Sequence, residues 1–254
     1  MRYFIRLAYN GAPFCGWQIQ PNSPSIQEEL ERALSLLLHD TITVVGCGRT
    51  DTGVHARNFY AHFDTEIKLN NTDLKQLTYK LNRFLAKEIA IFEIFPVAND
   101  FHARFSALER TYRYYISRKK DPFNQPYTYT LTLPINVKLM NIAAEYLLDV
   151  KDFTSFSKLH TQTHTNFCDV TSAFWKEQDN LLIFEISANR FLRNMVRAIV
   201  GTLLEVGMGK ISLTQFQDII AAHNRSKAGT SVPAHALFLE NVRYNFNTNP
   251  IENL

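Results

Sequence analysis

The sequence predicts an α+β fold made of two similar α/β halves, each with a largely antiparallel sheet and helices packed on one side. Amphipathic helical stretches alternate with short runs of β-branched or aromatic residues along the whole chain. Aromatic residues are mostly Phe and Tyr, 19 and 11 against 2 Trp, which is typical of sheet-rich proteins. Two prolines interrupt the pattern in Asp121–Pro126. We therefore divide the chain into an N-terminal half, 1–120, and a C-terminal half, 127–254.

The N-terminal half is expected to begin with a strand that turns at Asn10-Gly11. Ser25-Ile-Gln-Glu28 has the capping-box pattern, and apolar residues from Ile26 to Leu37 follow at helical spacing. The remaining expected elements are a short strand at 42–45, a loop at 46–57, a strand at 59–63, a helix at 74–85, a strand at 89–95 that stops at Pro96, and a strand at 110–116.

The C-terminal half is expected to repeat this plan, although no internal sequence repeat proves a duplication. The expected elements are a helix at 137–148, strands at 168–175 and 181–187 joined by a turn at 179–180, a helix at 191–205, a further helix after Ser212, and a strand at 237–244.

Composition limits the class of protein. A chain of 254 residues, 46% hydrophobic and 20% charged, can bury a substantial core. The net charge of +3 is mildly basic, so binding to nucleic acid would depend on local basic clusters. Three scattered cysteines indicate reduced thiols. The first residues resemble a strand rather than a signal peptide, and no apolar run is long enough to span a membrane. We therefore expect a cytoplasmic protein.

The loop 46–57 concentrates ionisable groups among glycines. Arg49 and Arg57 flank Asp51, and nearby positive charge would favour the ionised carboxylate. An ionised carboxylate can act as a nucleophile. The alternative is that Asp51 only caps a turn, with Gly53 supplying the unusual backbone angle.

Two other kinds of site use residues of this loop. Asp51-Thr-Gly occurs in aspartic proteases, but these need two carboxylates that share a proton, and the chain has one copy of the motif. Cys47, His55 and His62 could ligate zinc, but their spacing matches no compact zinc motif. We expect neither a protease nor a metal site.

The strand at 110–116 interleaves basic and aromatic residues. Arg110, Tyr112 and Tyr114 share one face, while Arg113 lies on the other. A face with Tyr and Arg can stack on a base and hold phosphates. The alternative is a half-buried strand with solvated arginines.

The segment 188–201 contains three arginines. Arg190, Arg193 and Arg197 line one helical face if the helix begins early enough to include Arg190. An apolar stripe on another face would anchor the helix, so that an arginine could pair with an active-site carboxylate. The alternative is a row of surface arginines.

Together these segments resemble the tRNA pseudouridine synthase A family, and the match runs in order over nearly the whole chain. The matching segments are Tyr9–Gln18, Gly46–Ala56, Phe101–Tyr114, Asn194–Gly201, Val206–Lys210 and Ala228–Ala234. The resemblance implies the pseudouridine synthase fold. Asn10, Thr52 and Ala236 depart from the family's usual residues, which bears on substrate preference more than on reaction type.

The resemblance implies a role for each of four residues. Asp51 would attack the uridine ring or its sugar, so that the glycosidic bond breaks, the base rotates, and a carbon–carbon bond forms. Arg49 would guide or replace the everted nucleotide, because the target base must leave a stacked stem. Tyr112 would stack on the target base, and Arg197 would form an ion pair that orients Asp51.

The resemblance also implies a substrate and an assembly. The enzyme would act on the anticodon stem-loop of tRNA, at the expected positions 38, 39 and 40, as a homodimer with no metal and no organic cofactor. We expect the RNA to contact a further set of residues: His55, Arg57, Arg110, Arg113 and Arg193. The alternative function is a catalytically inactive RNA-binding module of the same fold.

Overall fold

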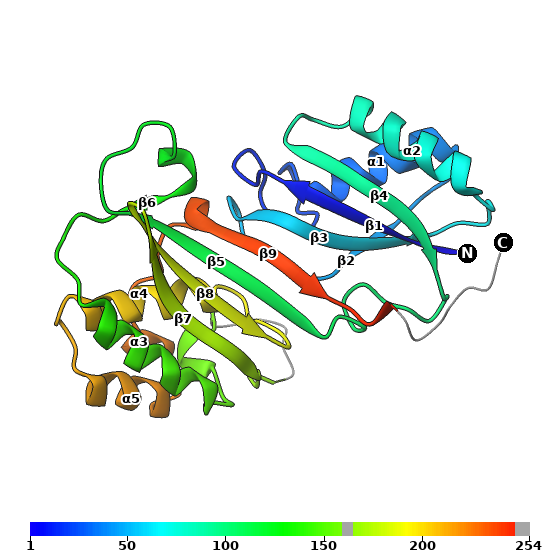
Figure 1. The fold of residues 1–254 in the computed structure, drawn as a ribbon. Coiled ribbons are helices and arrows are strands. Elements are labelled where there is room, and N and C mark those ends of the chain that lie inside the picture. The colour runs from blue at the N-terminus through cyan, green and yellow to red at the C-terminus, as the bar shows by residue number, and fades with distance from the viewer. Residues whose placement is uncertain (159–164, 247–254) are drawn as a thin grey trace. The chain divides into compact units, whose positions relative to one another are not determined.

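The computed structural model describes residues 1–158 and 165–246, which form two compact units. Unit 1 contains Met1–Leu108 and the chain from Leu239 onward, and unit 2 contains Glu109–Phe238. Each unit combines antiparallel strand pairs with helices (Figure 1). The predicted α+β class is therefore confirmed.

Unit 1 contains a sheet in which β4, β1, β3 and β9 are neighbours in that order, and β2 also pairs with β3. Its elements are β1 (Arg2–Tyr9), α1 (Ile26–Leu38), β2 (Val44–Gly46), β3 (His55–Asp64), α2 (Asn71–Phe84), β4 (Ile89–Val97) and the larger part of β9 (Leu237–Arg243).

The helices α1 and α2 lie on one side of the sheet of unit 1 (Figure 1). Helix α1 begins where predicted, because the Ser25 hydroxyl accepts a hydrogen bond from the Glu28 N–H, and it buries Ile26, Leu30 and Leu34. Helix α2 begins after Asn70, which forms a capping box with Asp73. Apolar residues at helical spacing thus become the buried faces of both helices.

Aromatic rings pack around Phe4, which alternates along β1 with Tyr3 and Ile5 and so points to the other face of the strand. Rings from the segment after β9 close this cluster, since Tyr244 and Phe246 both pack edge-on against Phe4. The C-terminal segment therefore completes the packing of unit 1.

Unit 2 contains a sheet in which β5, β8 and β7 are neighbours, with β6 parallel to β5. The helices of unit 2 lie on one side of its sheet (Figure 1). Its strands and α-helices are β5 (Glu109–Ser117), β6 (Tyr129–Thr130), α3 (Val137–Glu145), β7 (Val170–Gln178), β8 (Leu181–Ala188), α4 (Met195–Gly207) and α5 (Leu213–Ala221).

Short 3₁₀ helices occupy the connections of unit 2. They are η1 (Gln125–Tyr127), η2 (Tyr146–Leu148), η3 (Thr154–Phe156), η4 (Arg225–Lys227) and η5 (Ala234–Ala236). The predicted turn between β7 and β8 is confirmed, with Asp179 in the left-handed region at φ 54°.

The division into units differs from the predicted halves. The segment 121–126, expected to connect the halves, lies inside unit 2, where β5 before it pairs along its whole length with β8 after it. The last strand, β9, returns to unit 1 and lies beside β3.

The strand β4 also differs from its expected end at Pro96. It continues to Val97, with Pro96 opposite Tyr3 of β1. Proline lacks an N–H for the ladder, and β4 tolerates it because β4 lies at the end of the strand order.

Candidate active site

The predicted catalytic loop joins β2 to β3 in unit 1. It is shorter than expected, because His55, Ala56 and Arg57 already belong to β3. Within it, Asp51 is half-buried and Arg49 is exposed. Two paired strands thus fix both ends of the segment that carries Asp51.

The backbone before Asp51 is held by the opening segment of the chain. The hydroxyls of Tyr9 and Thr50 are 2.9 Å apart, and the Trp17 N–H donates to the Thr50 carbonyl at 3.2 Å. Gly16 adopts φ 92° and lies against that same carbonyl, where a Cβ atom has no room. Three residues of the opening segment therefore confine the chain around residue 50.

Two stacked aromatic side chains support the start of the loop, at Gly46. The Trp17 ring stacks on Phe59 with 4.2 Å between centroids. Gly46 lies directly against this ring, since an added Cβ would come within 2.5 Å of it. The Val54 N–H donates to the Asp51 carbonyl at 3.1 Å and closes the turn. The loop is rigid by packing, although it is rich in glycine.

Two further predicted residues lie on β3. His55 is only 1% exposed, and its Nδ1 accepts a hydrogen bond from the Gly11 N–H at 3.1 Å. This bond gives His55 a structural task, and its predicted contact with RNA stays a prediction. Arg57 is exposed and forms an ion pair with Glu240 of β9, with 3.2 Å between Nε and Oε1.

The zinc alternative finds no support in the described residues, where no group of His, Cys, Asp and Glu is arranged to hold a metal ion. His62 instead accepts a hydrogen bond at Nδ1 from the Ala103 N–H at 3.1 Å. Burial, followed by the charge of Arg2 and the neighbouring His102, lowers the pKa of His62 to about 4. His62 is therefore a neutral packing residue at neutral pH.

In unit 2, Tyr112 lies on β5 opposite Ile186 of β8. Its ring packs edge-on against Phe191 with 5.0 Å between centroids. Two residues along the same face, Tyr114 is fully buried and donates its hydroxyl proton to the Pro233 carbonyl at 3.0 Å. Burial raises the pKa of Tyr114. The face thus combines a half-buried Tyr112 with a buried anchor.

The arginine helix begins later than predicted. Helix α4 starts at Met195, after Asn194 in the left-handed conformation at φ 65°. Arg190 and Arg193 precede that break, so the expected row of three arginines on one helical face is wrong. Arg197 alone of the three lies on α4, a helix that is otherwise almost entirely buried.

Arg197 is fixed by reciprocal hydrogen bonds with Val232. Its Nε donates to the Val232 carbonyl at 2.7 Å, and the Val232 N–H donates to the Arg197 carbonyl at 3.2 Å. A guanidinium tied through Nε to the backbone keeps a restricted orientation, because the side chain loses most of its rotamers.

The segment Ala228–Pro233 is itself locked against α4. The Ser231 hydroxyl accepts from Asn194 Nδ2 at 2.6 Å and from Arg225 Nη2 at 2.8 Å. The Gly229 N–H donates to Thr202 Oγ1 at 3.0 Å. Sequence reasoning missed these supports and used the segment only as a motif of resemblance. The polar residues beside its glycine were the only available signal.

The remaining predicted substrate contacts are dispersed. Arg110 donates to the Asn189 carbonyl at 2.6 Å, whereas Arg193 is exposed. Arg113 pairs with Glu185 at 2.6 Å, on the face of β5 opposite to that of Tyr112. Their contacts with RNA stay predictions.

Each unit therefore brings together part of the predicted site. Asp51 and Arg49 share one loop of unit 1. In unit 2, the ring of Tyr112 contacts Phe191. Phe191 precedes α4 in the sequence by a few residues, and Arg197 lies in the first turn of α4. The pairing of Asp51 with Arg197 and Tyr112 joins the two units and stays a prediction.

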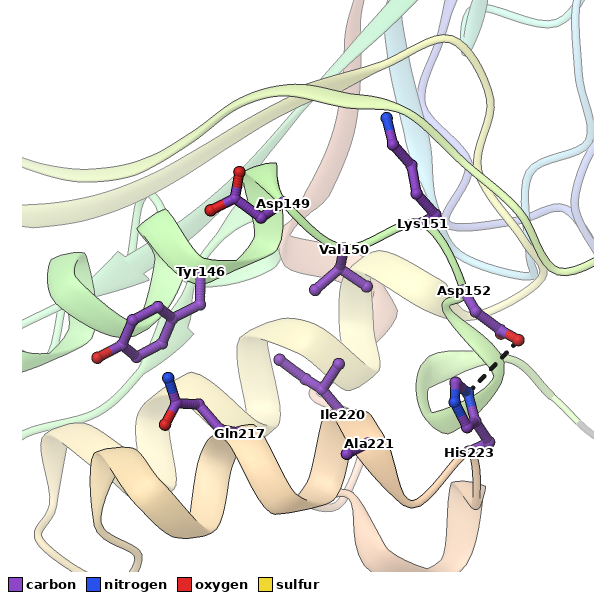
Figure 2. Close-up of a pocket in the computed structure, with 9 residues that line it drawn as sticks. All are labelled: Tyr146, Asp149, Val150, Lys151, Asp152, Gln217, Ile220, Ala221 and His223. Carbon is purple, nitrogen blue, oxygen red and sulfur yellow. Dashed lines mark ion pairs between the residues drawn. The ribbon is translucent and has the colours of Figure 1, made fainter.

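A pocket of about 440 Å³ lies in unit 2, where η2 and the following chain face α5 (Figure 2). Asp152 and His223 face each other across one end of it, with 3.4 Å between Oδ2 and Nδ1. The pocket contains none of the predicted site residues.

None of the helices in the described ranges is long and apolar enough to cross a membrane. The three cysteines, all within those ranges, take part in no disulfide.

Known proteins are similar to this chain over nearly its whole length. The family model for tRNA pseudouridine synthase matches residues 143–245. The tRNA pseudouridine synthase A of Parabacteroides distasonis is 52% identical over 251 residues, covering 99% of both chains. The proteins of the same name from Bacteroides fragilis and Bacillus subtilis are 52% and 39% identical, each over 96% of this chain and at least 96% of their own.

Proposed function

The chain belongs to the tRNA pseudouridine synthase A family, and we propose that it isomerises uridine to pseudouridine in the anticodon stem-loop of tRNA, at positions 38, 39 and 40. One observation supports Asp51 as the nucleophile: the half-buried carboxylate stands on a loop fixed by Tyr9, Gly16 and Trp17. Such a fixed loop suits covalent chemistry, which needs a nucleophile held in place before the substrate arrives.

The reaction is an isomerisation, so every atom of the uridine is kept. Asp51 attacks the base or the ribose, and the bond between N1 and C1′ breaks. After the base rotates, a bond forms between C5 and C1′, and the bond between Asp51 and the substrate breaks, which restores the carboxylate. The proton on C5 is then released, and N1 carries a proton in the product. Tritium at C5 therefore reports each turnover.

We assign positioning tasks to three other residues. Arg49 is exposed on the same loop as Asp51. It occupies or guides the position that the everted nucleotide leaves. Tyr112 stacks on the target base, which its half-buried ring on Phe191 allows. Arg197, tied to Val232, pairs with Asp51 and orients it.

Tritium release from an anticodon stem-loop labelled at uridine C5 tests the proposal. Wild type should release tritium, and Asp51→Asn, which removes the charge but keeps the shape, should not, because an amide is a poor nucleophile. The matched control is Asp179→Asn, in the exposed turn between β7 and β8, where asparagine also tolerates the left-handed backbone.

Two outcomes would contradict the proposal. Absence of release by wild type on several tRNAs would favour an RNA-binding module without activity. Full release by Asp51→Asn would remove Asp51 from the chemistry.

We further propose that the enzyme works in the cytoplasm as a homodimer. The absence of disulfides among its three cysteines is in keeping with a reducing compartment. Light scattering after gel filtration measures the assembly, and a molar mass near the 29.3 kDa of one chain would contradict the dimer.

A further inference from the structure

The loop between β5 and β6, residues 118–128, belongs to neither the proposed catalytic residues nor the core. It contains the consecutive basic residues Arg118, Lys119 and Lys120 and the side chain of Phe123. Phe123 is 88% exposed, more than any other large apolar side chain in the described part of the chain. An exposed aromatic ring close in sequence to basic residues is the combination on which unpaired bases of a nucleic acid stack.

The loop is rigid around this exposed ring. The Asp121 carboxylate accepts from the Phe123 N–H at 3.0 Å and from Asn124 Nδ2 at 2.7 Å. These hydrogen bonds, that from Asn124 first, lower the pKa of Asp121. Arg118 donates to the carbonyls of Leu131 and Leu133 at 2.7 and 2.8 Å. Phe123 is thus presented to solvent on a fixed backbone.

The three basic side chains of the loop differ in their surroundings. The Arg118 guanidinium donates two hydrogen bonds to backbone carbonyls and so has a structural role. Lys119 and Lys120 are exposed and form no ion pair within residues 1–158 and 165–246. Two cations beside an exposed ring complement a polyanion that also offers flat apolar faces.

The base of the loop is attached to the segment that holds Arg197. His235 Nε2 lies 3.2 Å from the Thr128 carbonyl. Only two residues earlier, the Pro233 carbonyl accepts from Tyr114, and Val232 binds Arg197. Arg118 follows the end of β5 and lies six positions after Tyr112, which corresponds to about 20 Å of extended chain.

We propose that this loop is a secondary RNA contact, in which Phe123 stacks on an unstacked base and Lys119 and Lys120 hold the flanking phosphates. The inference rests on the proposed function, because the RNA is the substrate whose target base stacks on Tyr112. The span of about 20 Å from Tyr112 to the start of the loop is within reach of an RNA hairpin bound at Tyr112.

Binding measurements test this with the full-length protein and the anticodon stem-loop. Phe123→Ala should raise the Kd by about ten-fold, since stacking of one base on an aromatic ring is worth roughly that factor. Phe123→Trp should retain tight binding. The double variant Lys119→Ala/Lys120→Ala should lower the slope of log Kd against log salt by about 1.5, because two phosphate contacts are lost.

Matched controls come from exposed residues of unit 1. Phe92→Ala removes a half-exposed phenylalanine of β4, and Lys75→Ala/Lys80→Ala removes two exposed lysines of α2. Both should bind RNA as wild type does. Equal melting temperatures for all variants show that the loop changes do not act through unfolding.

The outcomes distinguish this inference from the proposed function. Tritium release by wild type with an unchanged Kd in Phe123→Ala would overturn the loop contact and leave the enzyme assignment intact. A lowered molar mass of Phe123→Ala would assign the ring to an interface with a second copy of the chain instead. Absence of tritium release by wild type would count against the enzyme alone, since the RNA affinities are measured independently.

Discussion

Acid should destabilise unit 1 through His62. Its pKa of about 4 in the folded protein lies well below the ordinary value of 6.5. As the pH falls from about 7 to 5, the unfolded chain binds a proton at this residue and the folded chain does not. The difference of 1.5 pH units below 6.5 lowers the free energy of unfolding by roughly 2 kcal/mol at about pH 5.

Burial of the ring is the main cause of the low pKa of His62. The ring stacks on Phe4, and Nδ1 accepts from the Ala103 N–H, so a proton on Nδ1 would break that bond. Arg2 and His102 oppose a positive charge there, and Asp64 favours it less strongly. His62→Asn removes the titrating group but keeps an acceptor for Ala103.

Urea unfolding at about pH 7 and about pH 5 measures the effect. Trp17 reports on unit 1 when Trp175 of unit 2 is replaced by Phe, since both indoles are buried. The stability difference between wild type and His62→Asn should change by roughly 2 kcal/mol between the two pH values. His39→Asn, which replaces an exposed histidine, is the control. Parallel pH profiles for wild type and His62→Asn would refute the reasoning.

Three further substitutions test other contacts. Gly16→Ala should reduce tritium release by on the order of ten- to a hundred-fold, because its Cβ displaces the chain at Thr50; a wild-type rate would mean that the loop tolerates the shift. Asn70→Ala should lower the free energy of unfolding in urea by about 1 kcal/mol through loss of the capping box of α2, and an unchanged midpoint would contradict this. Tyr114→Phe should cost about 1–2 kcal/mol in the same assay, because the half-buried Pro233 carbonyl loses its donor; stability equal to wild type would show that water replaces the hydroxyl.

Local patterns were sufficient to predict most helices and strands. The apolar residues Ile26, Leu30 and Leu34 repeat at helical spacing after a serine cap, and α1 follows that pattern. The start of α4 could not be found this way, because Leu192 continues the apolar pattern across the break. The left-handed backbone of Asn194 prevents the helix from beginning earlier. The side chain of Asn194 donates a hydrogen bond to Ser231, which is distant in the sequence. Tertiary contacts decide such a boundary.

The candidate site shows the same division between chemistry and support. The chemical character of Asp51 and Arg197 is readable from the residues themselves, and the family resemblance implies their roles. Their supports are not readable, since the contacts of Thr50 with Tyr9 and of Arg197 with Val232 join segments distant in the sequence. Arg193 and Arg197 do not share a helical face as expected, because α4 begins only after Asn194, whose side chain binds the distant Ser231.

The return of β9 to unit 1 determines the order in which the newly made chain can fold. Unit 2 is continuous from Glu109 to Phe238, so it can fold as soon as this stretch leaves the ribosome. Unit 1 must wait for β9 and for the rings of Tyr244 and Phe246 that pack on Phe4. At about 5–20 residues per second, the first part of unit 1 waits roughly 7–26 seconds without its last strand. During synthesis, the loop that carries Asp51 therefore belongs to an unfinished unit until β9 and the segment to Phe246 have been made.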